Sequence, residues 1–198
     1  MLGLIIDTSY LYASVAIMSN SIVLDSQSNT KINKQTKDLN TMIEESMKKL
    51  GLDFQMLHYV AVSTGPGRFI GLRVGISTAN ALHLALKTPL LGMSNFDVIG
   101  YHYQKPKLGI VLNANGQHVY FQEYQYATSI SKIQVINKCQ LLNIKKNIYL
   151  VGNVEQVDEQ FILSMHHFAK FTYYKLSNTK NMALGYIKPQ YVINNYSS

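Results

Sequence analysis

One segment constrains the fold more than any other, because an apolar run, a glycine turn and a long segment with few charges follow one another directly. Residues 59–63 read YVAVS, the turn is Gly65-Pro66-Gly67, and the long segment runs from residue 71 to 86. A short apolar run bounded by a glycine turn is typical of a buried strand, and the longer segment is typical of a helix. This order predicts a strand that leads into a helix, as in α/β proteins.

The residues before this unit predict an antiparallel hairpin and an amphipathic helix. Short apolar runs at 2–6, 14–18 and 21–26 predict three antiparallel strands. Between residues 38 and 50, apolar side chains recur at spacings of three and four, as one face of a helix requires. These side chains are Leu39, Met42, Ile43, Met47 and Leu50. After the glycine unit, an extended link and a third helix ending near Tyr103 complete the first half.

After Pro106 the pattern restarts, which predicts two halves, 1–104 and 105–198, with the second one shortened. Each half begins with a hairpin and later passes through an α/β unit, an order that suggests duplication although no repeat is visible at the level of residues. The elements predicted for the second half are strands at 108–112, 118–126, 133–136, 148–151 and 171–176, and helices at 154–168 and 179–187.

Composition indicates a folded protein but does not identify a partner. With 47% hydrophobic residues, a chain of 198 residues suffices for one ordinary domain or for two small ones that share a core. The net charge of +7 permits an anionic partner such as nucleic acid, and it also fits a merely lysine-rich surface. Cys139 is the single cysteine, so we expect no intramolecular disulfide and a small buried thiol.

The amino terminus and the hydropathy predict a soluble cytoplasmic protein. The first residues lack the basic start and the small-residue cleavage site of a secretory signal. The longest weakly polar stretch, 74–86, is shorter than the roughly 20 apolar residues that span a bilayer. We therefore expect no membrane partner.

The glycine turn is the first candidate site. Free N–H groups and the helix dipole at the start of a helix can hold an anion, and the arginine fork suits phosphate or carboxylate. The candidate anion-binding residues are Gly65, Gly67, Arg68 and Arg73. The alternative is a tight turn whose glycines allow positive φ and close packing, with the arginines bracing it, since neither common glycine-rich phosphate motif is present.

Asp7 is the second candidate, because a carboxylate directly after a buried strand could orient a metal ion or a water near a phosphate. A nucleotide-phosphotransfer site would need a second acid at the corresponding place in the other half, where Asn113 stands. Tyr10 and Tyr12 also stand where glycines would let backbone N–H groups reach a phosphate. The residues therefore predict an impaired site with no cofactor and no metal. An ATP-dependent phosphotransferase or ATPase that uses Asp7 is the enzymatic alternative.

Longer stretches of the sequence resemble the TsaB (YeaZ) family. The block VAVSTGPGRFIGLRVGISTANALHLALKTPLLGMSNFDVI is similar to the family's GPGSFTGLRIG-like loop, the helix after it, a link of the type IPLVGVSSL and a further helix. The segment IIDTSYLYASVAI resembles the family's first hairpin, LNANGQHVYFQEY its DARxGEVY segment, and PQYVINN its PxYLRN ending. The similarity covers most of residues 1–125, and the loop with its helix is the specific part.

This resemblance implies an α/β protein with the actin-like and Hsp70-like (ASKHA) fold of two βββαβα-type halves, the second reduced. It implies a noncatalytic subunit, without catalytic residues, in the formation of threonylcarbamoyladenosine next to the tRNA anticodon. The implied partners are a TsaD-like catalytic subunit, a TsaE-like ATPase that joins the pair, tRNA indirectly, and a second copy in a homodimer. The implied partner-binding residues lie on the two helices of the first half: Leu39, Met42, Ile43, Ser46, Met47, Leu72, Gly75, Ile76, Ala79 and His83.

The sequence departs from the family pattern at the loop and at the second hairpin. Arg68 and Ile70 replace small hydroxyl residues, Asn113 and Asn115 replace the acid and base of DAR, and Gln35 lies near the place of a common histidine. These changes concern anion binding and leave the helical faces untouched. A third interpretation is a basic RNA-binding module, based on the net charge and on segments such as YHYQKPK that mix tyrosine with lysine.

Overall fold

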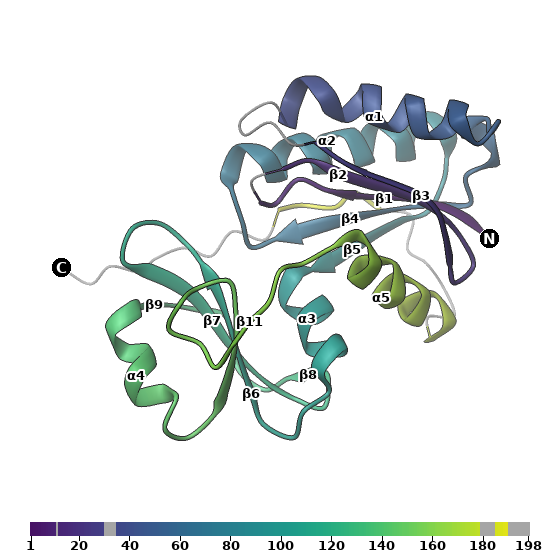
Figure 1. The fold of residues 1–198 in the computed structure, drawn as a ribbon. Helices are drawn as coiled ribbons and strands as arrows, with labels where there is room; N and C mark the ends of the chain where they lie inside the picture. Colours follow the sequence, from purple (N-terminus) through teal and green to yellow (C-terminus); the bar gives the residue numbers. More distant parts are fainter. Residues whose placement is uncertain (11, 30–34, 179–184, 190–198) are drawn as a thin grey trace. The chain divides into compact units, whose positions relative to one another are not determined.

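The computed structural model describes residues 1–10, 12–29, 35–178 and 185–189 (Figure 1). These residues form two compact units: unit 1 comprises Met1–Ser94 and Ser164–Pro189, and unit 2 comprises Asn95–Leu163. Each unit is built from a β-sheet and helices, so the predicted α/β class is confirmed. These units are defined by contacts in space and do not coincide with the predicted halves 1–104 and 105–198. The division of the sequence into those two halves stays a prediction.

The sheet of unit 1 has the strand order β3-β2-β1-β4-β5. β1 pairs antiparallel with β2 and parallel with β4, and β4 pairs parallel with β5. The predicted three-stranded hairpin is therefore confirmed, and the predicted extended link forms the fifth strand. The bounds are Leu2–Asp7 for β1, Ser14–Ser19 for β2, Ile22–Ser28 for β3, Tyr59–Gly65 for β4 and Leu90–Ser94 for β5.

Helices cover both faces of this sheet (Figure 1). α1 (Gln35–Lys49) and α2 (Phe69–Leu86) lie on one face, and α5 (Met165–Asn178) lies on the other. The apolar stripes of α1 and α2 meet the strands in one core cluster. Because the side chains of a strand alternate between faces, the same strands supply packing surface to both helical layers.

α2 is, within the part of the chain that the structure describes, a helix long and apolar enough to cross a membrane by length and composition alone. Its Ile76 and Ala79 pack in the core against the sheet, with exposed fractions of 3% and 0%. That packing is typical of a core helix in a folded domain. The apolar composition nevertheless extends to the opposite side of α2, which faces solvent.

The sheet of unit 2 has the order β11-β10-β6-β7-β8, and β9 also pairs with β7. β6 pairs parallel with β10 and antiparallel with β7. Its core cluster includes Val111, Phe121 and Leu150. The strands are β6 (Leu108–Asn113), β7 (His118–Gln125), β8 (Thr128–Ser129), β9 (Gln134–Asn137), β10 (Tyr149–Gly152) and β11 (Glu159–Gln160). The helices are α3 (Asn95–Tyr103) and α4 (Leu141–Ile144), and short 3₁₀ helices in the two units span Phe54–Met56 and Lys138–Gln140.

Two predictions for the residues after 153 are wrong. Of the predicted helix at 154–168 only residues 165–168 are helical, as the start of α5, while the residues before them form turns and the short strand β11; the predicted strand at 171–176 lies within α5. Met165, Phe168 and Thr172 are buried on one side of α5, and their spacings of three and four fit a helix. This packing outweighs the β propensity of the aromatic residues in FTYYK.

Two further expectations concern short segments. Most of the helix predicted at 179–187 lies outside the described residues, and the described positions 185–187 are not helical. Cys139, expected as a buried thiol, is exposed. It lies in the 3₁₀ helix Lys138–Gln140, which has no buried residue and therefore offers a thiol no core to enter.

Candidate functional site

The glycine turn after β4 packs directly onto the turn after β1. The backbone N–H of Arg68 donates a hydrogen bond of 2.7 Å to the carbonyl oxygen of Ser9. The hydroxyl of Thr8 donates a hydrogen bond of 2.7 Å to the carbonyl oxygen of Gly71, in the first turn of α2. Segments far apart in the sequence are thus held together at the carboxyl ends of the parallel strands β1 and β4.

The glycines of this region allow the close approach. A Cβ atom on Gly67 would lie 2.1 Å from the carbonyl oxygen of Ser9, and a Cβ atom on Gly75 would lie 2.2 Å from the hydroxyl oxygen of Thr8. Gly65 has a φ of +95°, a conformation that residues with side chains rarely adopt. The structure therefore favours the interpretation of a tight turn whose glycines serve close packing.

The same contacts occupy groups that an anion could use. The N–H of Arg68 already has an acceptor within the chain. The guanidinium of Arg73 lies 3.9 Å from the centre of the Phe69 ring, on the exposed side of α2. Anion binding by Gly65, Gly67, Arg68 and Arg73 stays a prediction.

Asp7 is buried at the end of β1, and its carboxylate supports the turn that follows. Its Oδ1 accepts hydrogen bonds from the Ser9 N–H at 2.9 Å and from the Ser9 hydroxyl at 2.6 Å. Burial raises the pKa of Asp7 and outweighs these hydrogen bonds, which lower it. A carboxyl group whose charged form is disfavoured is a weak ligand for a cation. Within the described ranges, no group of three His, Cys, Asp or Glu side chains is placed to hold a metal ion.

Unit 2 contains a hollow of about 450 Å³ at the carboxyl ends of β6 and β10. Asn113, which the sequence places where a second acid would be needed, lines it and donates its backbone N–H to the side-chain oxygen of Asn153 at 2.7 Å. The polar side chains of the lining are Asn113, Lys138, Asn153, Glu155, Gln156 and Gln160. Lys138 and Glu155 carry opposite charges, and the other polar side chains of the lining are neutral amides. The hollow can therefore bind a polar ligand but has no net charge to attract an ion.

Nine of the ten predicted partner-binding residues are buried within unit 1. Met47 is 2% exposed and Ala79 is 0% exposed, so neither side chain offers surface to a partner in this structure. The physical reason is that a periodic apolar stripe marks the side of a helix that meets the chain's own core. The tenth residue, His83, is half-buried, with its Nδ1 2.7 Å from the carbonyl oxygen of Thr88. The nine are Leu39, Met42, Ile43, Ser46, Met47, Leu72, Gly75, Ile76 and Ala79.

A surface that this reasoning missed lies on the opposite side of α2, and we call it the outer α2 face. Phe69 is 52% exposed, Ile70 is 70% exposed and Leu84 is 58% exposed. The face consists of the exposed residues Phe69, Ile70, Arg73, Ser77, Ala81 and Leu84. The signal in the sequence was available, because a helix that is apolar on all sides has more apolar surface than one core contact can bury.

The exposed side of α1 differs in character. Between residues 38 and 49, where the burial of α1 is described, the exposed residues are polar or charged: Asn40, Thr41, Glu44, Glu45, Lys48 and Lys49. Such a surface is typical of the solvent side of an amphipathic helix. Of the two helices, α2 therefore carries the apolar contact surface.

The end of the described chain is attached to α2. The side-chain amide of Asn80 donates to the carbonyl oxygen of Ile187 at 3.0 Å, and the N–H of Ile187 donates to the Oδ1 of Asn80 at 3.1 Å. The ring of Tyr186 meets that of His83 edge to face, with 6.1 Å between centres. We call residues 185–189 the strap, since these contacts fasten it to one flank of α2.

Comparison with known protein families and sequences gives consistent matches. A family model described as "TsaD: tRNA N6-adenosine threonylcarbamoyltransferase" matches residues 29–184. The tRNA threonylcarbamoyladenosine biosynthesis protein TsaB of Buchnera aphidicola subsp. Schizaphis graminum is 31% identical over 164 residues, which cover 76% of this chain and 77% of the relative. The TsaB of Buchnera aphidicola subsp. Acyrthosiphon pisum is 27% identical over 192 residues, which cover 89% of this chain and 84% of the relative.

Solved structures match the fold. YeaZ from Pseudomonas aeruginosa has a TM-score of 0.76 and 18% sequence identity, and the match covers 96% of this chain and 99% of that chain. A second Pseudomonas aeruginosa structure, described as similar to YeaZ, has a TM-score of 0.74 and 18% identity. At this level of identity the likeness establishes the fold, which is the one implied by the resemblance of the sequence.

Proposed function

The chain belongs to the TsaB (YeaZ) family, and we propose that it acts in threonylcarbamoyladenosine formation in tRNA as a noncatalytic scaffold that binds a TsaD-like catalytic subunit. The relatives named above carry the biosynthetic role in their names. The observation that supports a docking role is the outer α2 face, where bulky apolar side chains stand in solvent on a helix whose other side is fixed in the core.

Large exposed apolar side chains often mark an interaction surface, and on α2 they lie near its two ends, Phe69 and Ile70 in the first turn and Leu84 in the last. Phe69, Ile70 and Leu84 lie on one helix that packs against a five-stranded sheet, so the surface is held rigidly before any partner arrives. A preorganised surface loses little side-chain and backbone entropy on binding. Arg73 is the one charged residue of the face, and a single charge at an apolar interface is suited to orienting a partner.

The arrangement at the end of β1 supports the noncatalytic part of the proposal. Asp7 is hydrogen-bonded within its own turn, and burial disfavours its charged form. The glycine turn, which in a phosphate site would leave its N–H groups open, packs against Ser9. A TsaE-like ATPase would join through the catalytic subunit.

The test is a binding measurement with a purified TsaD-like subunit. The double variant Ile70→Glu/Leu84→Glu should bind at least about tenfold more weakly, because large apolar side chains that are buried in an interface each contribute on the order of 1–2 kcal/mol. Ile162→Glu is the matched control, since Ile162 is 82% exposed and lies in unit 2. All three side chains are exposed, so circular dichroism and the urea midpoint should stay unchanged in both variants.

Equal affinity of the double variant and the control would contradict the proposal. A second copy of the chain could also occupy this face, and sedimentation of the isolated protein separates the two cases. A homodimer that the double variant dissociates would assign the face to self-association, whereas a monomeric chain that binds the catalytic subunit would assign it to docking.

The enzymatic alternative remains an ATP-dependent phosphotransferase or ATPase that uses Asp7 and the glycine turn, and the observation that favours it is that the two lie together at the carboxyl ends of β1 and β4. Calorimetry with Mg-ATP distinguishes the two. Micromolar binding would favour the enzyme, and the absence of heat at millimolar nucleotide would favour the scaffold.

A further inference from the structure

More than half of the net positive charge of the chain comes from its last 39 residues, because they contain no acidic residue. Residues 160–198 contain four of the 18 basic residues and none of the 11 acidic residues, the last acid being Glu159. The rest of the sequence carries nearly balanced charge. A polyanion therefore meets no carboxylate in this stretch, and α5 is its principal described element.

One side of α5 is fixed and the other is open to solvent. Phe168 and Phe171 are buried, and the Thr172 hydroxyl donates to the Phe168 carbonyl oxygen at 2.7 Å and to the Met93 Sδ at 3.0 Å. Tyr173 and Tyr174 are 44% and 42% exposed. The exposed residues at spacings of three and four form what we call the outer α5 face: His166, Lys170, Tyr173, Tyr174 and Ser177, with half-buried Lys175 beside them.

We propose that the outer α5 face binds single-stranded RNA. Surfaces that bind single strands combine cations that follow the phosphates with aromatic rings on which bases stack. Lys170 and Lys175 supply the cations on α5, and Tyr173 with Tyr174 supplies the rings. Among the described residues, ion pairs hold Lys49 to Asp25 and Lys145 to Asp158 but hold neither lysine of α5.

The segment YHYQKPK also mixes tyrosine with lysine, but the residues around it rule it out as an RNA-binding surface. Glu159 accepts hydrogen bonds from the hydroxyls of Tyr103 at 2.7 Å and Tyr149 at 3.0 Å. Lys105 lies over the Tyr149 ring, 3.5 Å from its centre. A carboxylate between the rings would repel a phosphate backbone, so this cluster is not a surface for a polyanion.

The composition of the outer α5 face also favours RNA over a membrane. Its exposed residues include no aliphatic side chain that could enter a bilayer, and its apolar side is already buried against the sheet. The face lies on the side of the sheet opposite to α2 (Figure 1). A catalytic subunit docked on the outer α2 face would therefore leave the outer α5 face open. This inference rests on the proposed function only for the identity of the RNA, a tRNA.

The experiment measures binding of the full chain to a fluorescent 12-nucleotide RNA and to a tRNA transcript by anisotropy over a range of salt concentrations. Lys170→Ala/Lys175→Ala should lower the slope of log affinity against log salt by about 1.4, at about 0.7 for each phosphate contact. Tyr173→Ala/Tyr174→Ala should weaken binding about fivefold or more at constant slope. Lys146→Ala, an exposed lysine in unit 2, is the matched control and should bind like the wild type.

Three results would overturn the proposal. The first is no RNA binding at low salt, or an equal loss in the control. The second is unchanged affinity of the tyrosine variant, which would leave only nonspecific attraction. The third is binding to phosphatidylserine vesicles that the same variants abolish while RNA does not bind. Ile70→Glu/Leu84→Glu should keep full RNA affinity, so failure of the docking proposal and failure of this one give different results.

Discussion

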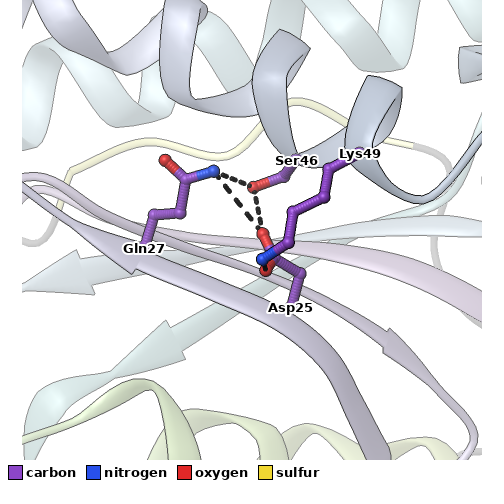
Figure 2. Close-up of polar contacts among 4 residues, drawn as sticks. All are labelled: Asp25, Gln27, Ser46 and Lys49. Atoms are coloured by element: carbon purple, nitrogen blue, oxygen red, sulfur yellow. Dashed lines mark hydrogen bonds and ion pairs between the residues drawn. The ribbon is translucent and has the colours of Figure 1, made fainter.

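At the scale of single residues, a polar cluster around the buried Asp25 fixes α1 to the edge of the sheet (Figure 2). Asp25 of β3 is 7% exposed and accepts from the Lys49 Nζ at 2.5 Å and from the Ser46 hydroxyl at 2.8 Å. The side-chain amide of Gln27 donates to the Ser46 hydroxyl oxygen at 2.9 Å. The carboxylate of Asp25 thus keeps its charge through contacts with a largely exposed lysine and two neutral side chains.

This cluster predicts a pH-dependent loss of stability. Burial raises the pKa of Asp25, but hydrogen bonds from Lys49, Ser46 and Gln27 outweigh it and hold the pKa below its usual value. A lowered pKa means that the stabilisation is complete above the unfolded value of about 3.9 and is lost as the pH falls through the folded value. Asp25→Asn should therefore lower the free energy of unfolding by about 1–2 kcal/mol at pH 7 and by less below pH 4.

Urea unfolding at pH 7, 5 and 3 measures this difference. Glu44→Gln is the control, because Glu44 is exposed on the same helix and takes no part in the cluster. A deficit of Asp25→Asn that is as large at pH 3 as at pH 7 would mean that the carboxylate charge is not what stabilises the contact.

At the scale of elements, sequence periodicity located the helices but not their functional sides. The spacing of Leu39, Met42 and Met47 correctly predicts α1, yet it marks the stripe that faces the core. The partner surface depends on what the core leaves uncovered, and that follows from tertiary packing. The same cause explains the wrong prediction at α5. The β propensity of Tyr173 and Tyr174 predicted a strand, but in the structure the segment is helical and buries Phe168 and Thr172 on one side.

The strap is an element whose attachment depends on one side chain. Asn80 pairs with both backbone groups of Ile187, as a neighbouring strand would. Asn80→Ala should remove both hydrogen bonds and speed hydrogen exchange at the Ile187 amide at least about tenfold. The reason is that local opening becomes about ten times more frequent when its free energy falls by on the order of 1.4 kcal/mol. Ser77→Ala, at an exposed position of α2, should leave that amide protected.

Hydrogen exchange followed by mass spectrometry of the carboxyl-terminal peptide reads this effect directly. Unchanged exchange in Asn80→Ala would indicate that the apolar contact of Ile187 with Gly92, where a Cβ would lie 3.1 Å from the Ile187 side chain, suffices to hold the strap.

At the scale of the whole molecule, unit 1 presents two chemically different surfaces on opposite sides of one sheet (Figure 1). The outer α2 face is apolar with a single charge, and the outer α5 face is cationic and aromatic. A rigid sheet between them lets two partners bind without competing. The proposed scaffold role is consistent with that separation, and the carboxylate of Asp7 accepts hydrogen bonds within its own turn.

This separation predicts that the two surfaces contribute independently to tRNA modification. In a reconstituted reaction with TsaD-like and TsaE-like subunits, Ile70→Glu/Leu84→Glu should lower the initial rate in a way that excess scaffold restores, because it weakens assembly. Lys170→Ala/Lys175→Ala should raise the KM for tRNA without changing kcat, and excess scaffold should not restore it. Because the two faces share no contact, the combined variant should show the product of the two losses at limiting scaffold and tRNA. A combined loss no greater than that of one variant alone would mean that both surfaces act on the same step, which two separate binding faces do not allow.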